Sequence, residues 1–191
     1  ESGERIAELA GDFRRRIAHA GMSRDGAVVA TLSADNNGNF DNFVELWNGV
    51  TGAQQGVNAG APSRIVFPAP IASFMVAAED DVIIAIGVNN VWYAYDLSTG
   101  RERWSNTSFR SHQMFGQTEN LELILIGSAN GQNAIIWSVL DNQIVTVLPP
   151  GVTAIASSPD NSLIAAASGN SVALYRLAPN GQYVEAGVFS E

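Results

Sequence analysis

Four segments of this chain repeat one pattern, and that repeat limits what the chain can fold into more than any other feature. Each segment begins with an acidic turn residue, followed by a nearly unbroken apolar run. The acidic residues are Asp25, Asp80, Glu119 and Asp160. A small polar turn then leads to a second strand, which carries one aromatic residue at a fixed place. The aromatic residues are Trp47, Tyr95, Trp137 and Tyr175, at spacings of 48, 42 and 38 residues.

The apolar runs indicate strands that are covered on both faces, because they do not alternate apolar with polar residues. They read VVATL, VIIAIG, LILIG and LIAAAS. Periods of about 40 to 50 residues with several short strands are typical of propeller blades, which stack face to face around an axis. We therefore predict an all-β fold, a β-propeller with four four-stranded antiparallel blades. Their expected bounds are about 13–58, 63–107, 110–148 and 151–190.

Two sets of turns support this prediction. Asn89-Asn90, Asn130-Gly131 and Gly169-Asn170 tolerate positive φ and suit tight hairpins. A second turn follows each aromatic strand, and its equivalent positions are Gly52, Gly100, Asn142 and Gly181. We expect these four residues to share one backbone conformation.

The N-terminal segment extends the repeat. GERIAEL matches GRERWSN and GQYVEAGV, so residues 3–10 are predicted to form the outer strand of a preceding blade. A short amphipathic helix is the alternative, since Ile6, Leu9, Phe13 and Ile17 lie at helical spacing. With this extra strand, we expect part of a larger propeller of about seven blades. A four-bladed ring, or a half-propeller completed by another chain, are the alternatives.

Several stretches resemble the WD-repeat β-propeller family. VTAIASSPDN, at 152–161, nearly completes the pattern V-x-x-V-x-x-S-P-D-x, and IAHAGMSRDG is close to it. AELAGDF resembles the Leu-x-Gly-His entry to the innermost strand, with Asp12 where His is expected. VWYAYDLSTGRERW resembles instead the tryptophan-docking repeat of quinoprotein-type propellers. The resemblance covers nearly the whole chain, but the Trp-Asp ending is absent: Trp47 precedes Asn48, and Trp137 precedes Ser138.

Composition narrows the classes of function. The net charge of −9 opposes binding to nucleic acid or to anionic membranes as a general activity. The chain has no cysteine, so disulfides and thiolate metal sites are excluded, and its two histidines offer little for a zinc site. No apolar run is long enough for membrane insertion, and the first residues do not resemble a secretory signal. We expect a cytoplasmic or other intracellular protein.

The stretch ADNNGNFDNFVELW spaces oxygen-bearing side chains at every second position, as calcium loops do. A calcium loop of the EF-hand type needs Gly at position six and Glu at position twelve. Counted from Asp35, Gly38 stands at position four and Leu46 at position twelve, so no metal site is predicted. We expect an exposed insertion between the second and third strands of its blade. Exposed loops tend to carry binding residues, here Asn37, Asn39, Phe40 and Asp41.

Three arginines follow the turn glycines at similar distances, in the expected connections between blades. They are Arg14, Arg64 and Arg110, with Phe13 and Arg15 beside the first. Such connections lie on one face of a propeller, so the arginines are expected at one rim. Because Arg binds carboxylates through a planar fork, the implied partner is an acidic peptide or protein segment. The alternative is that these arginines are solvated or pair with nearby acidic residues.

The remaining candidates for chemistry are few. The four repeated aromatic residues are expected in the core. His19 and His112 lack the neighbours of a nucleophilic triad, and no glycine loop fits a phosphate. We expect no catalytic residues and no cofactor. The leading hypothesis is a non-enzymatic scaffold that docks other proteins within a larger protein or assembly. The alternatives are a quinoprotein-like, ligand-binding or enzymatic propeller, and the sensor domain of a signalling protein.

Overall fold

The computed structural model describes residues 8–9, 15–77, 81–108, 133–139 and 141–190, and for 112–117 and 123–128 it describes the backbone. All regular structure in these ranges is β-strand. The strands are β1 (Arg16–Met22), β2 (Val28–Ala34), β3 (Phe43–Asn48), β4 (Arg64–Val66), β5 (Ile71–Ala77), β6 (Val82–Gly87), β7 (Trp92–Asp96), β8 (Glu102–Asn106), β9 (His112–Gln117), β10 (Leu123–Ser128), β11 (Asn133–Ser138), β12 (Gln143–Pro150), β13 (Val152–Ser157), β14 (Leu163–Ser168), β15 (Ser171–Leu177) and β16 (Tyr183–Ser190). Within the described ranges, we find no helix with the length and apolar character to cross a membrane.

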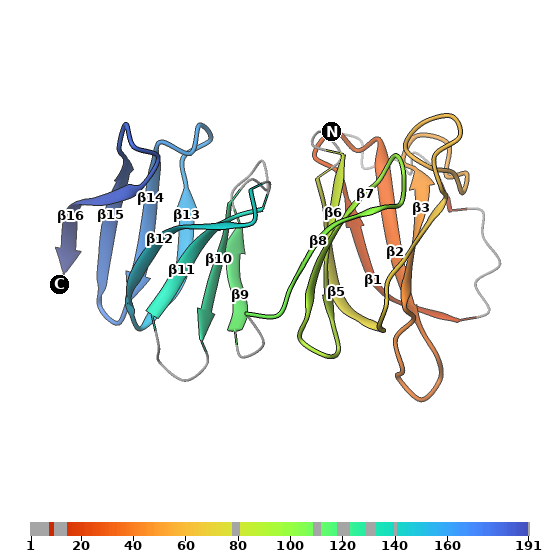
Figure 1. The fold of residues 1–191 in the computed structure, drawn as a ribbon, viewed down its shortest axis with the longest axis horizontal. Coiled ribbons are helices and arrows are strands. Elements are labelled where there is room, and N and C mark those ends of the chain that lie inside the picture. Colours follow the sequence, from red (N-terminus) through yellow and green to blue (C-terminus); the bar gives the residue numbers. More distant parts are fainter. Residues whose placement is uncertain are drawn as a thin grey trace. The chain divides into compact units, whose positions relative to one another are not determined.

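The strands form four four-stranded sheets, each made of consecutive antiparallel strands (Figure 1). The orders are β1-β2-β3-β4, β5-β6-β7-β8, β12-β11-β10-β9 and β13-β14-β15-β16. The chain divides into two compact units, Glu1–Arg110 and Ser111–Glu191, with two sheets in each. The predicted all-β fold of four four-stranded antiparallel blades is therefore confirmed.

In the first unit, sheets β1–β4 and β5–β8 share one apolar core. Ala30, Leu32 and Leu46 contribute from the first sheet, and Ile83 and Tyr93 from the second. The opposite side of β2 is also buried, because Thr31 is only 1% exposed. Strand β6 is buried along most of its length. The continuous apolar runs at these two strands therefore mark strands that are covered on both faces, as predicted.

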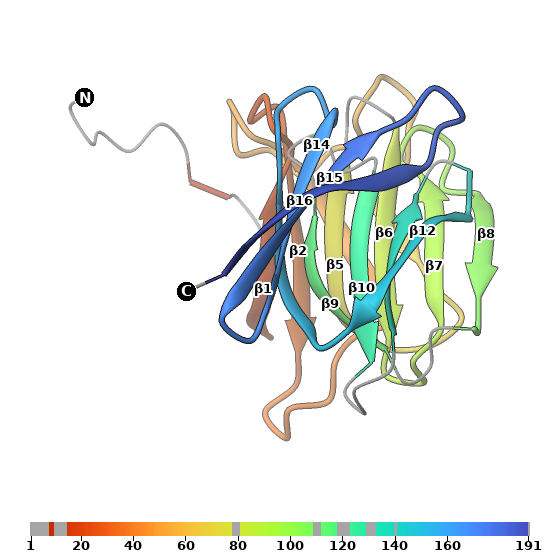
Figure 2. The same cartoon turned by 90° about the vertical axis from the view of Figure 1, so that its left-hand side faces the viewer.

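In the second unit, one face of sheet β13–β16 packs against sheet β9–β12. Ile164 and Ala166 of β14 and Tyr175 of β15 meet Ile136 and Leu148 across this interface. The Tyr183 side chain closes the core at the outer strand, where its hydroxyl donates to a backbone carbonyl of the β13–β14 turn. Figure 2 shows β16 beside β15, in agreement with their register.

The corner after the third strand has the same conformation in all four sheets. The predicted equivalent residues all have positive φ: Gly52 at 71°, Gly100 at 68°, Asn142 at 53° and Gly181 at 80°. Residues with a Cβ rarely adopt this conformation, and Asn is one of the few that do so readily. Asn90 and Gly169 likewise have positive φ in their hairpins. The prediction that these turn residues share one backbone conformation is therefore confirmed at the four corners.

The turn between the first two strands also repeats. In the first sheet the Ser23 hydroxyl donates to Asp25 at 2.6 Å, and in the last sheet Ser158 donates to Asp160 at 2.6 Å. Each carboxylate also accepts from a backbone amide two residues later. These hydrogen bonds, led by the one from the serine, lower the pKa of Asp25 and lower that of Asp160 to about 2. Asp80 and Glu119 lie outside the described residues.

One boundary differs from the prediction. The outer strand of the first sheet is β4, whose Arg64 pairs with Glu45 of β3, so this blade continues beyond residue 58 to Val66. The segment expected to form that strand makes a single bridge, between Trp47 and Gln54. Residues 53–58 read AQQGVN and hold a single bulky apolar side chain, whereas β4 buries Ile65 completely. Of the predicted strand at 3–10, only residues 8 and 9 are described, and they are not in a strand.

Candidate functional site

The loop of residues 35–42 joins β2 to β3, where the sequence placed an insertion. Asp35 organises it: its Oδ1 accepts hydrogen bonds from the backbone amides of Asn37 and Asn39, both at 2.9 Å. Its Oδ2 accepts another from the Asn39 Nδ2, also at 2.9 Å. These bonds, led by that of the Asn39 side chain, lower the pKa of Asp35. The loop therefore has one internally fixed shape, with Asn37 and Asn39 exposed.

Asp41 closes the loop and is buried, with 6% of its surface exposed. Its Oδ1 forms an ion pair with Nη1 of Arg15, while its buried Oδ2 has no partner among the described residues. Its backbone N–H donates to Ser33 and its carbonyl accepts from Ile71, both at 2.9 Å. Burial raises the pKa of Asp41, and the Arg15 guanidinium opposes that rise.

The expectation of a fully exposed loop is corrected at its C-terminal half. Phe40 is half-buried and packs against the core of the first unit. Its ring centroid lies 5.8 Å from that of His19 on β1. Apolar burial of Phe40 draws the following residue, Asp41, into the sheet, which explains why a charged loop residue loses its exposure. The loop thus has an exposed amide-bearing half and a buried anchoring half.

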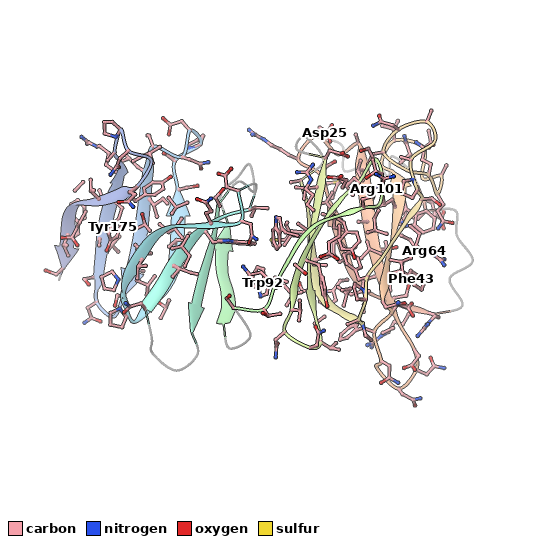
Figure 3. The ribbon with its side chains drawn as sticks, in the orientation of Figure 1. Asp25, Phe43, Arg64, Trp92, Arg101 and Tyr175 are labelled. Atoms are coloured by element: carbon pink, nitrogen blue, oxygen red, sulfur yellow. The ribbon has the colours of Figure 1, made fainter. Side chains whose placement is uncertain are left out.

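The sequence predicted that Arg64 lies in a connection between blades. In the structure it lies on β4. Its Nη2 binds Glu45 Oε1 at 2.8 Å, and its guanidinium carbon lies 4.0 Å from the centre of the Phe43 ring. Figure 3 shows Arg64 and Phe43 together on the first sheet. This is a cation–π contact combined with an exposed ion pair. Arg64 therefore makes its contacts with side chains of the neighbouring strand β3.

The predicted arginine rim is brought together only in part. Arg15 lies beside the loop, 43% exposed, with a carboxylate partner. Arg64 pairs with Glu45 on β3, and its charge, like that of Arg15, acts to lower the pKa of Asp41. Phe13, Arg14 and Arg110 are outside the described residues. The two described arginines therefore fit the alternative reading, in which the arginines pair with nearby acidic residues, while the acidic partner stays a prediction.

The repeated aromatic residues belong to the core in each sheet. Trp47 and Trp137 are 2% and 1% exposed, and Tyr95 and Tyr175 are 7% and 6% exposed. The Trp47 Nε1 donates to the Thr31 hydroxyl at 2.8 Å, which satisfies a buried donor and a buried acceptor together. Burial, with Glu102 nearby, raises the pKa of Tyr95 to about 12. The role of Thr31 as an acceptor for Trp47 was not predicted from the sequence. Its place within an apolar run was the available signal, because a polar residue there is expected to be buried with a hydrogen-bond partner.

A hollow lies at the end of the first unit opposite the 35–42 loop. It has a volume of about 410 Å³ and is lined by Asp25, Ala27, Val28, Val57, Asn58, Asp81 and Ser98. Both carboxylates already accept hydrogen bonds: Asp25 from Ser23 of its own turn, and Asp81 from Ser98 of the corner between β7 and β8. Among the described residues, no group of three or more His, Cys, Asp or Glu side chains is placed to hold a metal ion.

Comparison with known proteins gives a fold and no family. No protein-family model matches this sequence, and no curated protein is similar to it in sequence. The β-propeller domain of Cps50 (Swd1) from Myceliophteria thermophila matches at a TM-score of 0.52 and 14% identity. That match covers 90% of this chain and 57% of the solved chain.

BamB from Moraxella catarrhalis matches at a TM-score of 0.51 and 14% identity, over 82% of this chain and 45% of the solved one. This chain therefore spans about half the length of the solved chains that it matches. At such identity the similarity shows the fold alone. Four repeated sheets with one corner geometry, together with these matches, identify the chain as a β-propeller fold.

Proposed function

We propose that this chain is a non-enzymatic protein-interaction module, which docks other proteins through the loop end of its first sheet. The loop end comprises residues 35–42 and Arg15. One observation carries the proposal: the loop is fixed from within by Asp35 and Asp41 while Asn36, Asn37 and Asn39 remain exposed. A loop that is already ordered loses little conformational entropy on binding.

The chemistry of the exposed side chains indicates the kind of partner. Carboxamides donate and accept hydrogen bonds, so they suit polar backbone or side-chain groups of another protein. Arg15 stands beside them and keeps much of its side chain exposed although it pairs with Asp41. A partner segment with a carboxylate would add a charge-assisted hydrogen bond there. The acidic-partner prediction is thus narrowed to this end of the first sheet.

Two features support a binding role over a catalytic one. The His19 ring packs beside the Phe40 ring, and this contact helps to hold the buried half of the loop against β1. The carboxylates at the hollow of the opposite end, Asp25 and Asp81, accept hydrogen bonds from the neighbouring turn residues Ser23 and Ser98. A rigid repeated scaffold with one elaborated loop is a common basis for binding sites.

The test is quantitative affinity capture from the source organism with the wild-type chain and two double variants. In Asn36→Ala/Asn37→Ala the exposed carboxamides of the loop are removed, whereas the matched control Gln55→Ala/Asn58→Ala removes two exposed amides at the other end of the same sheet. We expect specific partners to fall by at least about tenfold, equivalent to 1.4 kcal/mol, with the first variant alone. Equal capture by both variants and wild type would overturn the proposal.

A further inference from the structure

The two faces of the last sheet differ in what covers them. Register places Ile155, Ile164, Ala166 and Tyr175 on one face, which packs against sheet β9–β12. The other face, here called the outward face, consists of Ala154, Ala156, Leu163, Ala165, Ala167, Val172, Leu174, Arg176, Val184, Gly187 and Phe189. All eleven are described, and Arg176 is the one charged residue among them.

The outward face is open to solvent despite its apolar character. Phe189 is 64% exposed, Val184 50% and Val172 39%, and Ala154 and Ala156 are also exposed. Antiparallel sheets with one solvated face normally alternate apolar and polar residues. Here both faces are apolar, and a contiguous apolar patch of this kind marks an interaction surface.

The outward face has the same kinds of side chain as the covered face. The covered face combines the small Ala166 with the bulky Ile164 and Tyr175. The outward face combines alanines on β13 and β14 with Leu174 and Phe189 on β15 and β16. Both faces therefore suit a sheet-on-sheet contact.

We propose that the outward face packs against a further four-stranded blade of the same polypeptide, one outside these 191 residues. The contact continues the stacking between sheets β9–β12 and β13–β16. Its area also favours a covalently linked occupant: stable complexes between separate proteins use about 20 to 30 residues a side, roughly twice this face. A blade in the same chain needs less area because linkage gives it a high effective concentration. This inference is independent of the docking role of the loop end.

The absence of cysteine allows a direct test by single-thiol labelling. Val172→Cys places a thiol on the outward face, and Val50→Cys, at a turn residue that is 67% exposed, is the matched control. Each variant is made in the 191-residue chain and in the polypeptide at its native length, and maleimide labelling is followed by intact mass. We expect both thiols to react rapidly in the shorter chain. In the longer one, labelling at position 172 should slow by at least about tenfold, with the control unchanged.

Every other result contradicts the proposal. Equal labelling at position 172 in both polypeptides would mean that no blade covers the face. Protection in the 191-residue chain at every concentration would indicate a ring closed by its own first sheet. Protection that grows with concentration would indicate a second copy as the occupant. A native polypeptide with the 20.2 kDa mass of this chain would also exclude a further blade.

Discussion

The first and last sheets are built on the same frame and end in different surfaces. Both have the serine–aspartate turn between their first two strands and a glycine with positive φ after the third. The first sheet then adds the 35–42 loop and a long segment before β4, whereas the last sheet joins its middle strands by the short turn at Gly169. Local turn chemistry thus maintains the frame, while loops and outer faces are free to differ.

Their outer surfaces differ most. On the face of the first sheet away from its core, Thr31, Ser33 and Trp47 are buried, and Glu45 and Arg64 form an ion pair. The last sheet has an almost uncharged, exposed surface on its own face away from the core. In the repeat this is the opposite face, because Trp47 aligns with Tyr175, which lies on the covered side of the last sheet. The comparison indicates that the first sheet closes the face away from its core with its own residues and that the last sheet leaves its own such face open.

The largest effect is expected at the repeated aromatic position. Trp47→Ala should lower the free energy of unfolding by about 3–5 kcal/mol, because it opens a cavity and removes the hydrogen-bond partner of buried Thr31. Tyr175→Ala in the last sheet should lower the free energy of unfolding by less, because it does not remove a hydrogen bond to a buried hydroxyl group. Urea unfolding of both variants checks this. A smaller loss for Trp47→Ala than for Tyr175→Ala would contradict the buried pair.

The corner glycines allow a second comparison. Gly181 has open space around its Cβ position, so Gly181→Ala should cost about 1–2 kcal/mol from backbone strain alone. At Gly52 the added methyl group would overlap the backbone carbonyl of Glu8, and Gly52→Ala should therefore cost more than about 2 kcal/mol. Thermal unfolding measures both. Equal losses would mean that Glu8 does not pack against Gly52 in solution.

The ion pairs Arg15–Asp41 and Arg64–Glu45 should differ in how much they stabilise the fold, because one carboxylate is buried and the other pair is exposed. Arg15→Ala leaves the Asp41 carboxylate buried and unpaired, and we expect a loss of about 1–2 kcal/mol, reduced from the buried-pair value because Arg15 is partly exposed. Arg64→Ala breaks an exposed pair and should cost less than about 1 kcal/mol. Chemical denaturation at pH 7 gives both numbers. The reverse order would show that Asp41 is solvated.

The smallest effect is a pH dependence at the shared turn. Hydrogen bonds from Ser158 and Ser162 lower the pKa of Asp160 to about 2 from its ordinary value of 3.8, so the folded state favours the charged form. Its contribution to stability is therefore complete above pH about 4 and is lost as the pH falls through about 2. Melting temperatures of wild type and Asp160→Asn should differ at neutral pH and converge near pH 2. A constant difference down to pH 2 would exclude this linkage.

The frame was predictable from sequence because its signals are local. Positive φ at the four corners is predictable from residue type, because these positions are Gly52, Gly100, Asn142 and Gly181. The aromatic positions recur at a period that indicates a repeat. The burial of Asp41 was not predictable, because it depends on Arg15, 26 residues away, and on the packing of Phe40. The position of β4 was also missed: Arg64–Val66 is three residues long and follows a segment that satisfies the same turn signal.

The most direct test of the account compares the two outer surfaces within one chain. Single cysteines replace Ser33, which is 7% exposed on the first sheet, and Val172, which is 39% exposed on the last. In dilute 191-residue chain under native conditions, we predict rapid thiol labelling at position 172 and labelling at least about tenfold slower at position 33. Equal rates at the two positions would contradict the claim that the last sheet keeps an open apolar face where the first sheet, at Ser33, does not.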